Sequence, residues 1–477
     1  MFQYIKRYFP KTAIAAAGAV LLLNMGTASA GVSVLHPGAG NRPPKTPDWN
    51  VENSREENTL EQYKNQGEPI KRLDSKKGVS AITLKVMLGE SLVSAAVAAD
   101  TSYKLVDGNE GKTLASFAAN VPVRVSVDGG RMLINGEKIN SRIVTVQTES
   151  SSARVKYNNA AYRGTLQLIY DGRGLQVINN LSLEDYVKGV LPSEMSSSWH
   201  PEVLKAQAVA ARTFALYSKG KEHSASSGYD LCSSTHCQVY SGVAAETENA
   251  NRAVDATYGQ VMYYDNKVIY AAFHSSSGGA TENSEDVWGN YLPYLRSVTD
   301  DDSRSPYHNW TERFTVPQVQ KKLEASGKGV GTLQSMELTA SSGTSITGRS
   351  ASGRAYGIKF TGSSGSAVLT GEQLRVIFGL KSSMFNVRTE RTVPLTGGSG
   401  QKAEGKRSSN GVTAAPAAMR GSAMKISGSE TVVFDGHGFG HGLGMAQYGA
   451  KAMAEKGSRY DAVLKHYYTD IVIQEIY

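Results

Sequence analysis

Cysteine is the scarcest feature of this sequence, with only Cys232 and Cys237 among 477 residues. So few cysteines exclude the dense disulfide frameworks of small secreted domains, and a hydrophobic core has to stabilise the fold. The pair lies in LCSSTHCQVY, close to His223 and His236. A disulfide and a zinc site are both compatible with this pattern, and the cysteine count leaves the two alternatives open.

Long apolar runs are missing after the first 30 residues, which excludes a bundle of membrane-spanning helices. Residues 1–30 combine the cationic start MFQYIKRYFPK, the apolar run TAIAAAGAVLLLNMG and the small residues Ala28-Ser29-Ala30. This pattern predicts a secretory signal peptide, with a retained N-terminal membrane anchor as the alternative. We therefore expect an exported protein in the cell wall, the periplasm or the extracellular space.

Nucleic-acid-binding motifs are also absent, and export argues against a nucleic-acid partner. The formal net charge is +8, and removal of residues 1–30, which contain Lys6, Arg7 and Lys11, leaves +5. A mildly basic exported chain suits an anionic surface such as a bacterial envelope.

The sequence pattern changes several times along the rest of the chain. We expect an α+β fold, with mixed helices and short strands around a ligand-binding cleft. Short β-prone runs such as AITLKVML and SRIVTVQT change to helical patterns at Ser182. The stretch 396–424 is of low complexity. The expected organisation is a polar tether over 31–76, a β-rich N-terminal region over 77–150, a core over 151–300, an α+β insertion over 301–430, and a C-terminal loop and helix over 431–477 that complete the core.

Two consecutive helices are predicted after Ser182. This serine begins a capping-box pattern, and Pro192 is expected to end the first helix. His200 can cap the second helix, with Pro201 at its first position. Glu194 then falls on the turn between the helices, a place from which a side chain can point into a cleft.

Glu194 is the most informative carboxyl group, because Val190, Met195 and Trp199 make its neighbourhood apolar. Burial raises the pKa of a carboxyl group, and such a group can act as a general acid near neutral pH, as in sugar-cleaving sites. The alternative is a surface glutamate at a helix start, favoured by the helix dipole.

Histidines alternate with glycines in GHGFGHGLG, residues 436–444. His437 and His441 are four positions apart, which on a helix would suggest a metal-binding pair, but the glycines disfavour a helix. The pattern favours a loop whose bare backbone closely approaches another chain or a polymeric ligand. A structural loop with packed histidines is the alternative.

A second backbone-exposing turn, residues 275–281, follows a strand that ends at His274. A serine nucleophile is conceivable there, but no G-x-S-x-G elbow is present. The segment SSSGGAT suits a hydroxyl-lined sugar site, and an ordinary turn is the alternative.

Six segments resemble, in the same order, the successive blocks of the bacterial SpoIID/LytB family, which comprises stage II sporulation protein D and the amidase enhancers. The resemblance runs from about Ala153 to the C-terminus, whereas the tether and residues 80–148 match only loosely. The six segments are LSLEDYVKGVLPSEM, WHPEVLKAQAVAARTFAL, THCQVYSG, HSSSGGATENSEDVW, LTGEQLRVIFGLKSSMF and GHGFGHGLGMAQYGAKAMAEKG.

The resemblance implies a peptidoglycan lytic transglycosylase that prefers glycan strands stripped of their peptides. The catalytic glutamate of the family maps onto Glu194. One carboxyl group suffices, because it first protonates the oxygen that bridges N-acetylmuramic acid (MurNAc) and N-acetylglucosamine (GlcNAc). It then takes the proton of the MurNAc C6 hydroxyl, which closes a 1,6-anhydro ring without an activated water.

The resemblance also implies a saccharide-binding set and, in some members, a zinc site. The zinc candidates are Cys232 and Cys237 with His223 or His236, a structural set of three ligands. The saccharide-binding candidates are Gln207, Arg212, His274, Ser275, Gly278, Gly279, Thr281, His437, His441, Gln447 and Tyr448.

Two other functions compete with this interpretation. A cell-wall-binding module could enhance an N-acetylmuramoyl-L-alanine amidase without cleaving anything itself. A zinc hydrolase that uses His437 and His441 is weaker, because no acidic ligand or HExxH motif accompanies them. The expected partners are therefore peptidoglycan glycan strands and a cell-wall amidase or a membrane-anchored protein.

Overall fold

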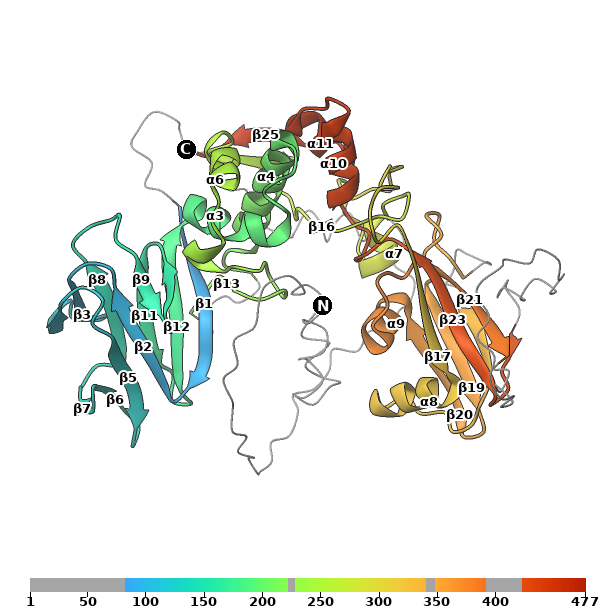
Figure 1. Cartoon of the computed structure of the whole chain (residues 1–477), viewed down its shortest axis with the longest axis horizontal. Helices are drawn as coiled ribbons and strands as arrows, with labels where there is room; N and C mark the ends of the chain where they lie inside the picture. The colour runs from blue at the N-terminus through green and yellow to red at the C-terminus, as the bar shows by residue number, and fades with distance from the viewer. Residues whose placement is uncertain (1–81, 222–227, 340–347, 392–422) are drawn as a thin grey trace, which may run out of the picture. The chain divides into compact units, whose positions relative to one another are not determined.

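The computed structural model describes residues 82–221, 228–339, 348–391 and 423–477. The expected signal peptide, the tether, His223 and nearly all of the low-complexity stretch lie outside the described residues. Helices and several separate sheets make up the described part, which agrees with an α+β fold (Figure 1). Two compact units are present: Trp310–Gly436 forms one, and the described residues up to Asn309 form the other together with His437–Tyr477. No helix among the described residues is long and apolar enough to cross a membrane.

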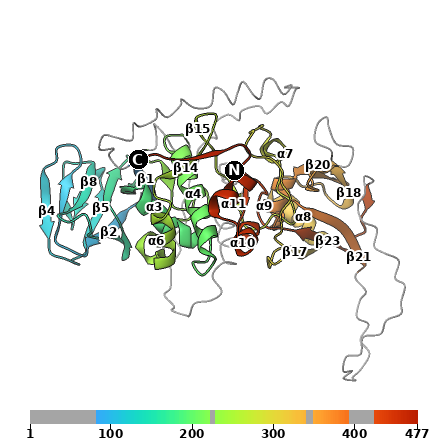
Figure 2. The same cartoon turned by 90° about the horizontal axis from the view of Figure 1, so that it is seen from above.

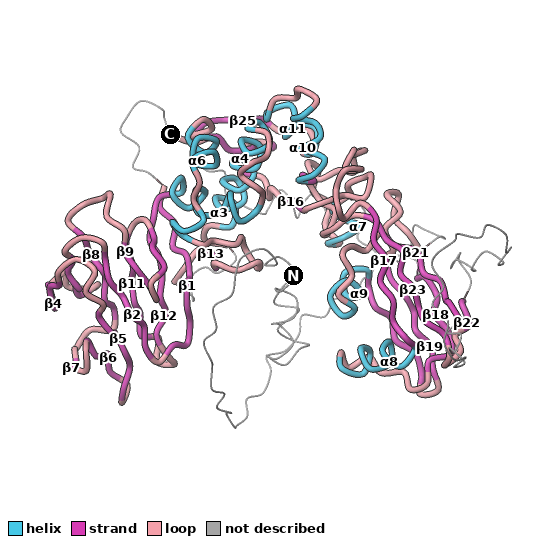
Figure 3. Tube along the Cα trace, viewed as in Figure 1, coloured by secondary structure: helices cyan, strands magenta, loops and turns pink. Residues whose placement is uncertain are grey.

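The β-rich region contains two sheets, with strand orders β13-β1-β12-β11-β8-β3-β4 and β10-β9-β2-β5-β6-β7. At the start of β1, Thr83 and Lys85 are exposed whereas Leu84 and Val86 are buried, because successive side chains point to opposite faces. Figure 3 draws these strands in magenta. They are β1 (Thr83–Leu92), β2 (Ser94–Ala99), β3 (Tyr103–Asp107), β4 (Thr113–Phe117), β5 (Val123–Asp128), β6 (Arg131–Ile134), β7 (Glu137–Lys138), β8 (Ile143–Thr148), β9 (Val155–Tyr157), β10 (Ala160–Tyr162), β11 (Thr165–Tyr170), β12 (Leu175–Ser182) and β13 (Leu231–Cys232).

The first predicted helix is α3 (Leu183–Glu194), and the Ser182 hydroxyl caps it by accepting the backbone N–H of Asp185. The expectation that Pro192 ends this helix was wrong. Proline removes one N–H donor, but the N–H of Met195 still donates to the Leu191 carbonyl, so the last turn closes beyond the proline. Glu194 is therefore the last residue of α3 rather than part of a turn.

The second predicted helix is α4 (Pro201–Ser218), with His200 as its N-cap and Pro201 at its first position, as expected. Most of its residues are buried, because helices and a sheet surround it. Both Figure 1 and Figure 2 show α4 between α6 and the pair of α10 and α11. The elements around it are α3, α6 (Glu248–Asp255), α10 (Gln447–Glu455), α11 (Tyr460–Tyr467) and the sheet β15-β14-β25, formed by β14 (Gln260–Tyr264), β15 (Lys267–Val268) and β25 (Val472–Glu475). The short helix η3 (Gly242–Ala245) packs against α3 and β10.

The unit Trp310–Gly436 has its own core, in which Phe360, Phe378 and Phe434 are buried together. Its sheets have the strand orders β17-β23-β21 and β20-β19-β18-β22. The elements are β17 (Asn309–Thr315), α8 (Val316–Ala325), β18 (Leu333–Thr339), β19 (Gly357–Gly362), β20 (Gly365–Thr370), α9 (Gly371–Phe378), β21 (Phe385–Arg391), β22 (Met424–Lys425) and β23 (Glu430–His437).

Candidate active site

Glu194 ends α3 with a partly buried side chain. Burial raises the pKa of its carboxyl group from 4.5 to about 7, and a hydrogen bond from the backbone N–H of Val239 opposes this shift only in part. Among the described residues, no second carboxylate contributes to the shift. A carboxyl group with a pKa near neutrality can both donate and accept a proton at the same pH.

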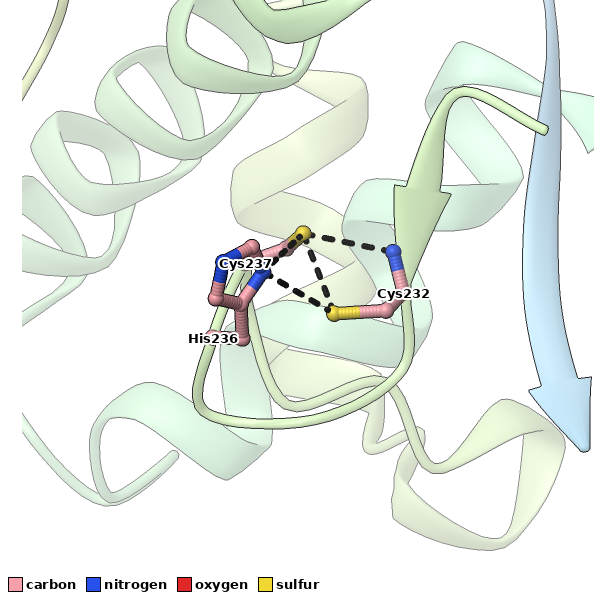
Figure 4. A group of neighbouring side chains, drawn as sticks. All are labelled: Cys232, His236 and Cys237. Carbon is pink, nitrogen blue, oxygen red and sulfur yellow. Dashed lines mark hydrogen bonds between the residues drawn. The ribbon is translucent and has the colours of Figure 1, made fainter. Parts of the chain in front are cut away.

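The side chains of Cys232, His236 and Cys237 converge on one point (Figure 4). The two sulfur atoms are 3.1 Å apart, and His236 Nδ1 lies 3.6 Å from Cys232 Sγ and 3.5 Å from Cys237 Sγ. Tetrahedral zinc, with bonds of about 2.3 Å to sulfur and 2.0–2.1 Å to nitrogen, separates sulfur from nitrogen by about 3.5 Å and two sulfurs by about 3.8 Å. The sulfur–nitrogen distances match zinc, and the sulfurs need to move apart by about 0.7 Å.

No disulfide joins Cys232 and Cys237 in this arrangement. The hydrogen bond between the two cysteine side chains lowers the pKa of Cys232 to about 3, while burial opposes the shift and a hydrogen bond with His236 adds to it. The thiolate is the form of cysteine that binds metal. These three residues can therefore hold a metal ion, and His223, the alternative imidazole, lies outside the described residues.

The cysteine loop and Glu194 are directly connected. Strand β13 pairs in parallel with β1, with Cys232 opposite Met87, so the loop starts at the edge of the large sheet. After Cys237, the side chain of Gln238 accepts a hydrogen bond of 3.2 Å from the Tyr186 hydroxyl of α3, and Val239 donates to the Glu194 carboxyl group. The conformation of this loop therefore fixes one hydrogen-bond donor of the acid.

The two glycine-rich segments lie against each other. Strand β16 (Phe273–His274) pairs in parallel with β24 (Met445–Ala446), and an isolated bridge joins Ser276 to Phe439. A Cβ atom on Gly444 would lie 2.0 Å from the Ala272 carbonyl oxygen. The expected loop with a closely approached backbone is thus present, and the segment that approaches it belongs to the same chain.

The three histidines predicted to bind saccharide, His274, His437 and His441, all lie at this junction. His274 Nδ1 lies 3.1 Å from the Leu443 carbonyl, and the backbone N–H of Leu443 donates to His441 Nδ1 at 3.0 Å. The ring of His437 lies 6.3 Å from that of His308. His274 is buried, whereas His437 and His441 are partly exposed and can meet a ligand.

Two of the predicted saccharide-binding residues on α4 are core residues. Arg212 is fully buried and donates to both oxygens of Glu184, at 2.7 and 2.8 Å, and to the carbonyls of Val254 and Gln260. These four hydrogen bonds hold the Arg212 guanidinium in the core, and its predicted saccharide-binding role stays a prediction. Gln207 is also fully buried; its Oε1 lies 3.4 Å from Gln447 Nε2.

The turn 275–281 is likewise more structural than expected. Thr281 is fully buried and its Oγ1 accepts the N–H of Val298 at 2.8 Å, and its predicted place in a saccharide site stays a prediction. Ser275, Gly278 and Gly279 remain partly exposed, and Ser275 O accepts the N–H of Tyr448 at 3.0 Å.

Two residues that hold this turn, Asp300 and Asp302, were not predicted from the sequence. Asp302 is buried and accepts hydrogen bonds from the Ser276 hydroxyl and from the Gly278 N–H, and its other oxygen lies 2.8 Å from His308 Nδ1. Asp300 accepts from the Ser277 hydroxyl at 2.6 Å, and burial raises its pKa. The run TDDDSRSPYH, residues 299–308, has the composition of an ordinary polar loop, and only its three consecutive aspartates could have indicated a role.

Comparison with known proteins agrees with this site. The family model described as Stage II sporulation protein matches residues 171–264, which include Glu194 and the cysteine loop. Stage II sporulation protein D of Bacillus subtilis (strain 168) is 33% identical over 319 residues, 63% of this chain and 76% of that protein. The protein of the same name from Bacillus amyloliquefaciens is 32% identical over 312 residues, 62% and 76% of the two chains.

The amidase enhancer of Bacillus subtilis (strain 168) is also similar, with 30% identity over 391 residues. The match covers 72% of this chain but 49% of the enhancer. With identity above 30% over three quarters of the sporulation proteins, the chain belongs to the SpoIID/LytB family.

Proposed function

We propose that this chain is an exported lytic transglycosylase of peptidoglycan that cleaves the MurNAc–GlcNAc bonds of peptide-stripped glycan strands. The observation that supports this most is Glu194, a single carboxyl group with a pKa of about 7 at the end of α3. Membership of the family agrees with a role at the cell envelope.

The proposed reaction uses this one group twice. Protonated Glu194 donates its proton to the bridging oxygen, and the bond between that oxygen and MurNAc C1 breaks, so that GlcNAc leaves with a hydroxyl group. The Glu194 carboxylate then accepts the proton of the MurNAc C6 hydroxyl while O6 bonds to C1. The products are a 1,6-anhydro-MurNAc end and a regenerated acid, and no water is consumed.

The metal in this proposal is a structural zinc ion held by Cys232, His236 and Cys237. Bound zinc would cross-link the loop and keep its thiolates deprotonated. The residues of the chain then act on the acid: Tyr186 holds Gln238, and Val239 donates to Glu194. A fixed donor keeps the carboxyl group in one orientation toward the glycosidic oxygen.

Mass spectrometry of peptide-free glycan strands incubated with the protein tests the proposal. The expected products carry 1,6-anhydro-MurNAc ends and no oxygen from labelled water. Glu194→Gln should abolish cleavage, because an amide cannot donate this proton. Glu248→Gln is the matched control, because Glu248 is an exposed glutamate on α6. Reducing ends that carry solvent oxygen would indicate a hydrolase, and normal cleavage by Glu194→Gln would place the acid elsewhere.

A second candidate rests on the similarity to the amidase enhancer. In that case the chain would bind glycan strands and increase the activity of an N-acetylmuramoyl-L-alanine amidase without making anhydro ends. Adding Glu194→Gln protein to such an amidase separates the two functions. Undiminished enhancement by this variant, with no anhydro product from the unmodified chain, would favour the enhancer.

A further inference from the structure

Four partly exposed aromatic side chains form a continuous row that begins five residues after Glu194. Trp199 and Tyr448 have ring centroids 5.0 Å apart, Tyr448 and Tyr307 6.4 Å, and Tyr307 and Phe439 4.9 Å. We name Trp199, Tyr448, Tyr307 and Phe439 the aromatic row. Three separate segments of the chain supply it, and all belong to the same unit as Glu194.

The geometry of the row suits sugar rings. Its contacts are edge-to-face, with interplanar angles of 62°, 81° and 72°, so one ring's edge meets its neighbour's face and does not cover both faces of either ring. The C–H face of a pyranose can pack on an exposed aromatic face, while the tyrosine hydroxyls and the indole N–H can bond to its polar groups.

A cation, Lys451, stands at the Trp199 end of the row. Lys451 lies three residues after Tyr448 on α10, and its Nζ is 5.0 Å from the centre of the Trp199 ring. Lys451 pairs with Glu455 at 3.7 Å, and Glu455 also pairs with Arg304. Two cations therefore share one carboxylate, and one positive charge is left uncompensated within this group of three.

We propose that the aromatic row binds the glycan strand and that Lys451 binds the lactyl carboxylate of a MurNAc residue. This inference rests on the proposed function, for which it identifies residues that set substrate specificity. While a peptide is attached, the lactyl carbonyl is part of a neutral amide. Removal of the peptide leaves a carboxylate, so Lys451 gains an ionic partner only on peptide-free MurNAc.

Binding measurements on the full-length chain carrying Glu194→Gln test this, because that variant leaves the ligand intact. The probes are chitohexaose, which is neutral, and peptide-free glycan strands, which carry lactyl carboxylates. Trp199→Ala and Tyr307→Ala should each weaken binding of both probes about tenfold, whereas Trp199→Phe should retain most of it. Lys451→Gln should weaken only the binding of the glycan strands, about fivefold, and reduce its dependence on salt.

Lys456→Gln is the matched control, since Lys456 caps the same helix but makes no cation–π contact with the aromatic row in the described part of the chain. Its Nζ pairs with Asp301 at 2.6 Å. It should bind both probes like the parent, and melting temperatures establish that each variant is folded. Unchanged binding by Trp199→Ala and Tyr307→Ala would show that the aromatic row does not bind the glycan strand. Equal losses for both probes in Lys451→Gln would overturn the carboxylate contact.

The two proposals fail in different measurements. A chain that forms anhydro ends while its row variants bind normally would keep the proposed function and lose this inference. A chain that forms no anhydro ends, but shows the expected binding pattern, would keep the saccharide-binding row and lose the proposed reaction.

Discussion

The backbone N–H of Val239 donates to the carboxyl group of Glu194, and Val239 lies two residues after Cys237. The candidate metal loop and the candidate acid are therefore parts of one local structure. Tyr186 strengthens the connection, because it belongs to the same helix as Glu194 and donates to Gln238 of the loop. Changes at either group should affect the other, and this gives the first two predictions.

Glu194→Gln should stabilise the protein at alkaline pH while it abolishes cleavage. The folded-state pKa of Glu194 is raised from 4.5 to about 7, so its contribution to stability is present below pH 4.5 and lost as the pH rises through 7. We compare the variant with the parent by the difference between their unfolding free energies. This difference should be up to about 3 kcal/mol more favourable to the variant at pH 8 than at pH 4. Urea unfolding of both proteins at the two pH values measures this difference. A difference that does not change with pH would contradict the raised pKa of Glu194.

Zinc content should be about one ion per chain, and Cys232→Ser or Cys237→Ser should abolish it. Loss of zinc should lower the melting temperature and reduce cleavage, because the loop that carries Val239 is released. Thr235→Ala is the matched control, as Thr235 is an exposed residue of the same loop. Purified protein with neither metal nor reactive thiols would establish a disulfide instead.

Arg212→Met should destabilise the protein strongly, because it leaves Glu184 buried without its cation. Breaking one partner of a buried ion pair costs about 3–5 kcal/mol. Arg252→Met, in the exposed pair with Glu248, should cost less than about 1 kcal/mol. Denaturant unfolding distinguishes the two, and restoration by the double variant Arg212→Met, Glu184→Gln would show that the unpaired charge is the cause. Equal small losses would favour Arg212 as a candidate for the ligand site.

Gly444→Ala tests how closely the two glycine-rich segments approach. Gly444 and Gly220 both have left-handed backbone, with φ of +64° and +73°, but a Cβ atom meets the Ala272 carbonyl only at Gly444. Gly220→Ala should therefore cost about 1–2 kcal/mol in unfolding free energy, and Gly444→Ala roughly 1–3 kcal/mol more. Equal costs in thermal or urea unfolding would mean that the close approach is not maintained in solution.

Local signals in the sequence were sufficient to predict the helices that carry the site. The partners of buried residues could not be predicted in this way. Ser182 and His200 predicted the starts of α3 and α4, because a helix cap depends on residues within one turn. The ion pair of Arg212 was not predicted, because its partner Glu184 is 28 residues away and no spacing rule connects them. Asp302 was missed for the same reason, since its role depends on the fold bringing Ser276 and His308 to it.

His437→Ala and His441→Ala separate three roles that the sequence left open. Both side chains are partly exposed, and the cysteine loop provides the candidate metal ligands, so we expect zinc content to be unchanged in both variants. Cleavage should fall in both if they position sugar. His441→Ala should also lower the unfolding free energy by about 1 kcal/mol, because the Leu443 N–H loses its acceptor. Metal content, melting and cleavage measured on the same samples check this. Loss of zinc would make the histidines ligands, and full activity in both would remove them from the predicted saccharide-binding set.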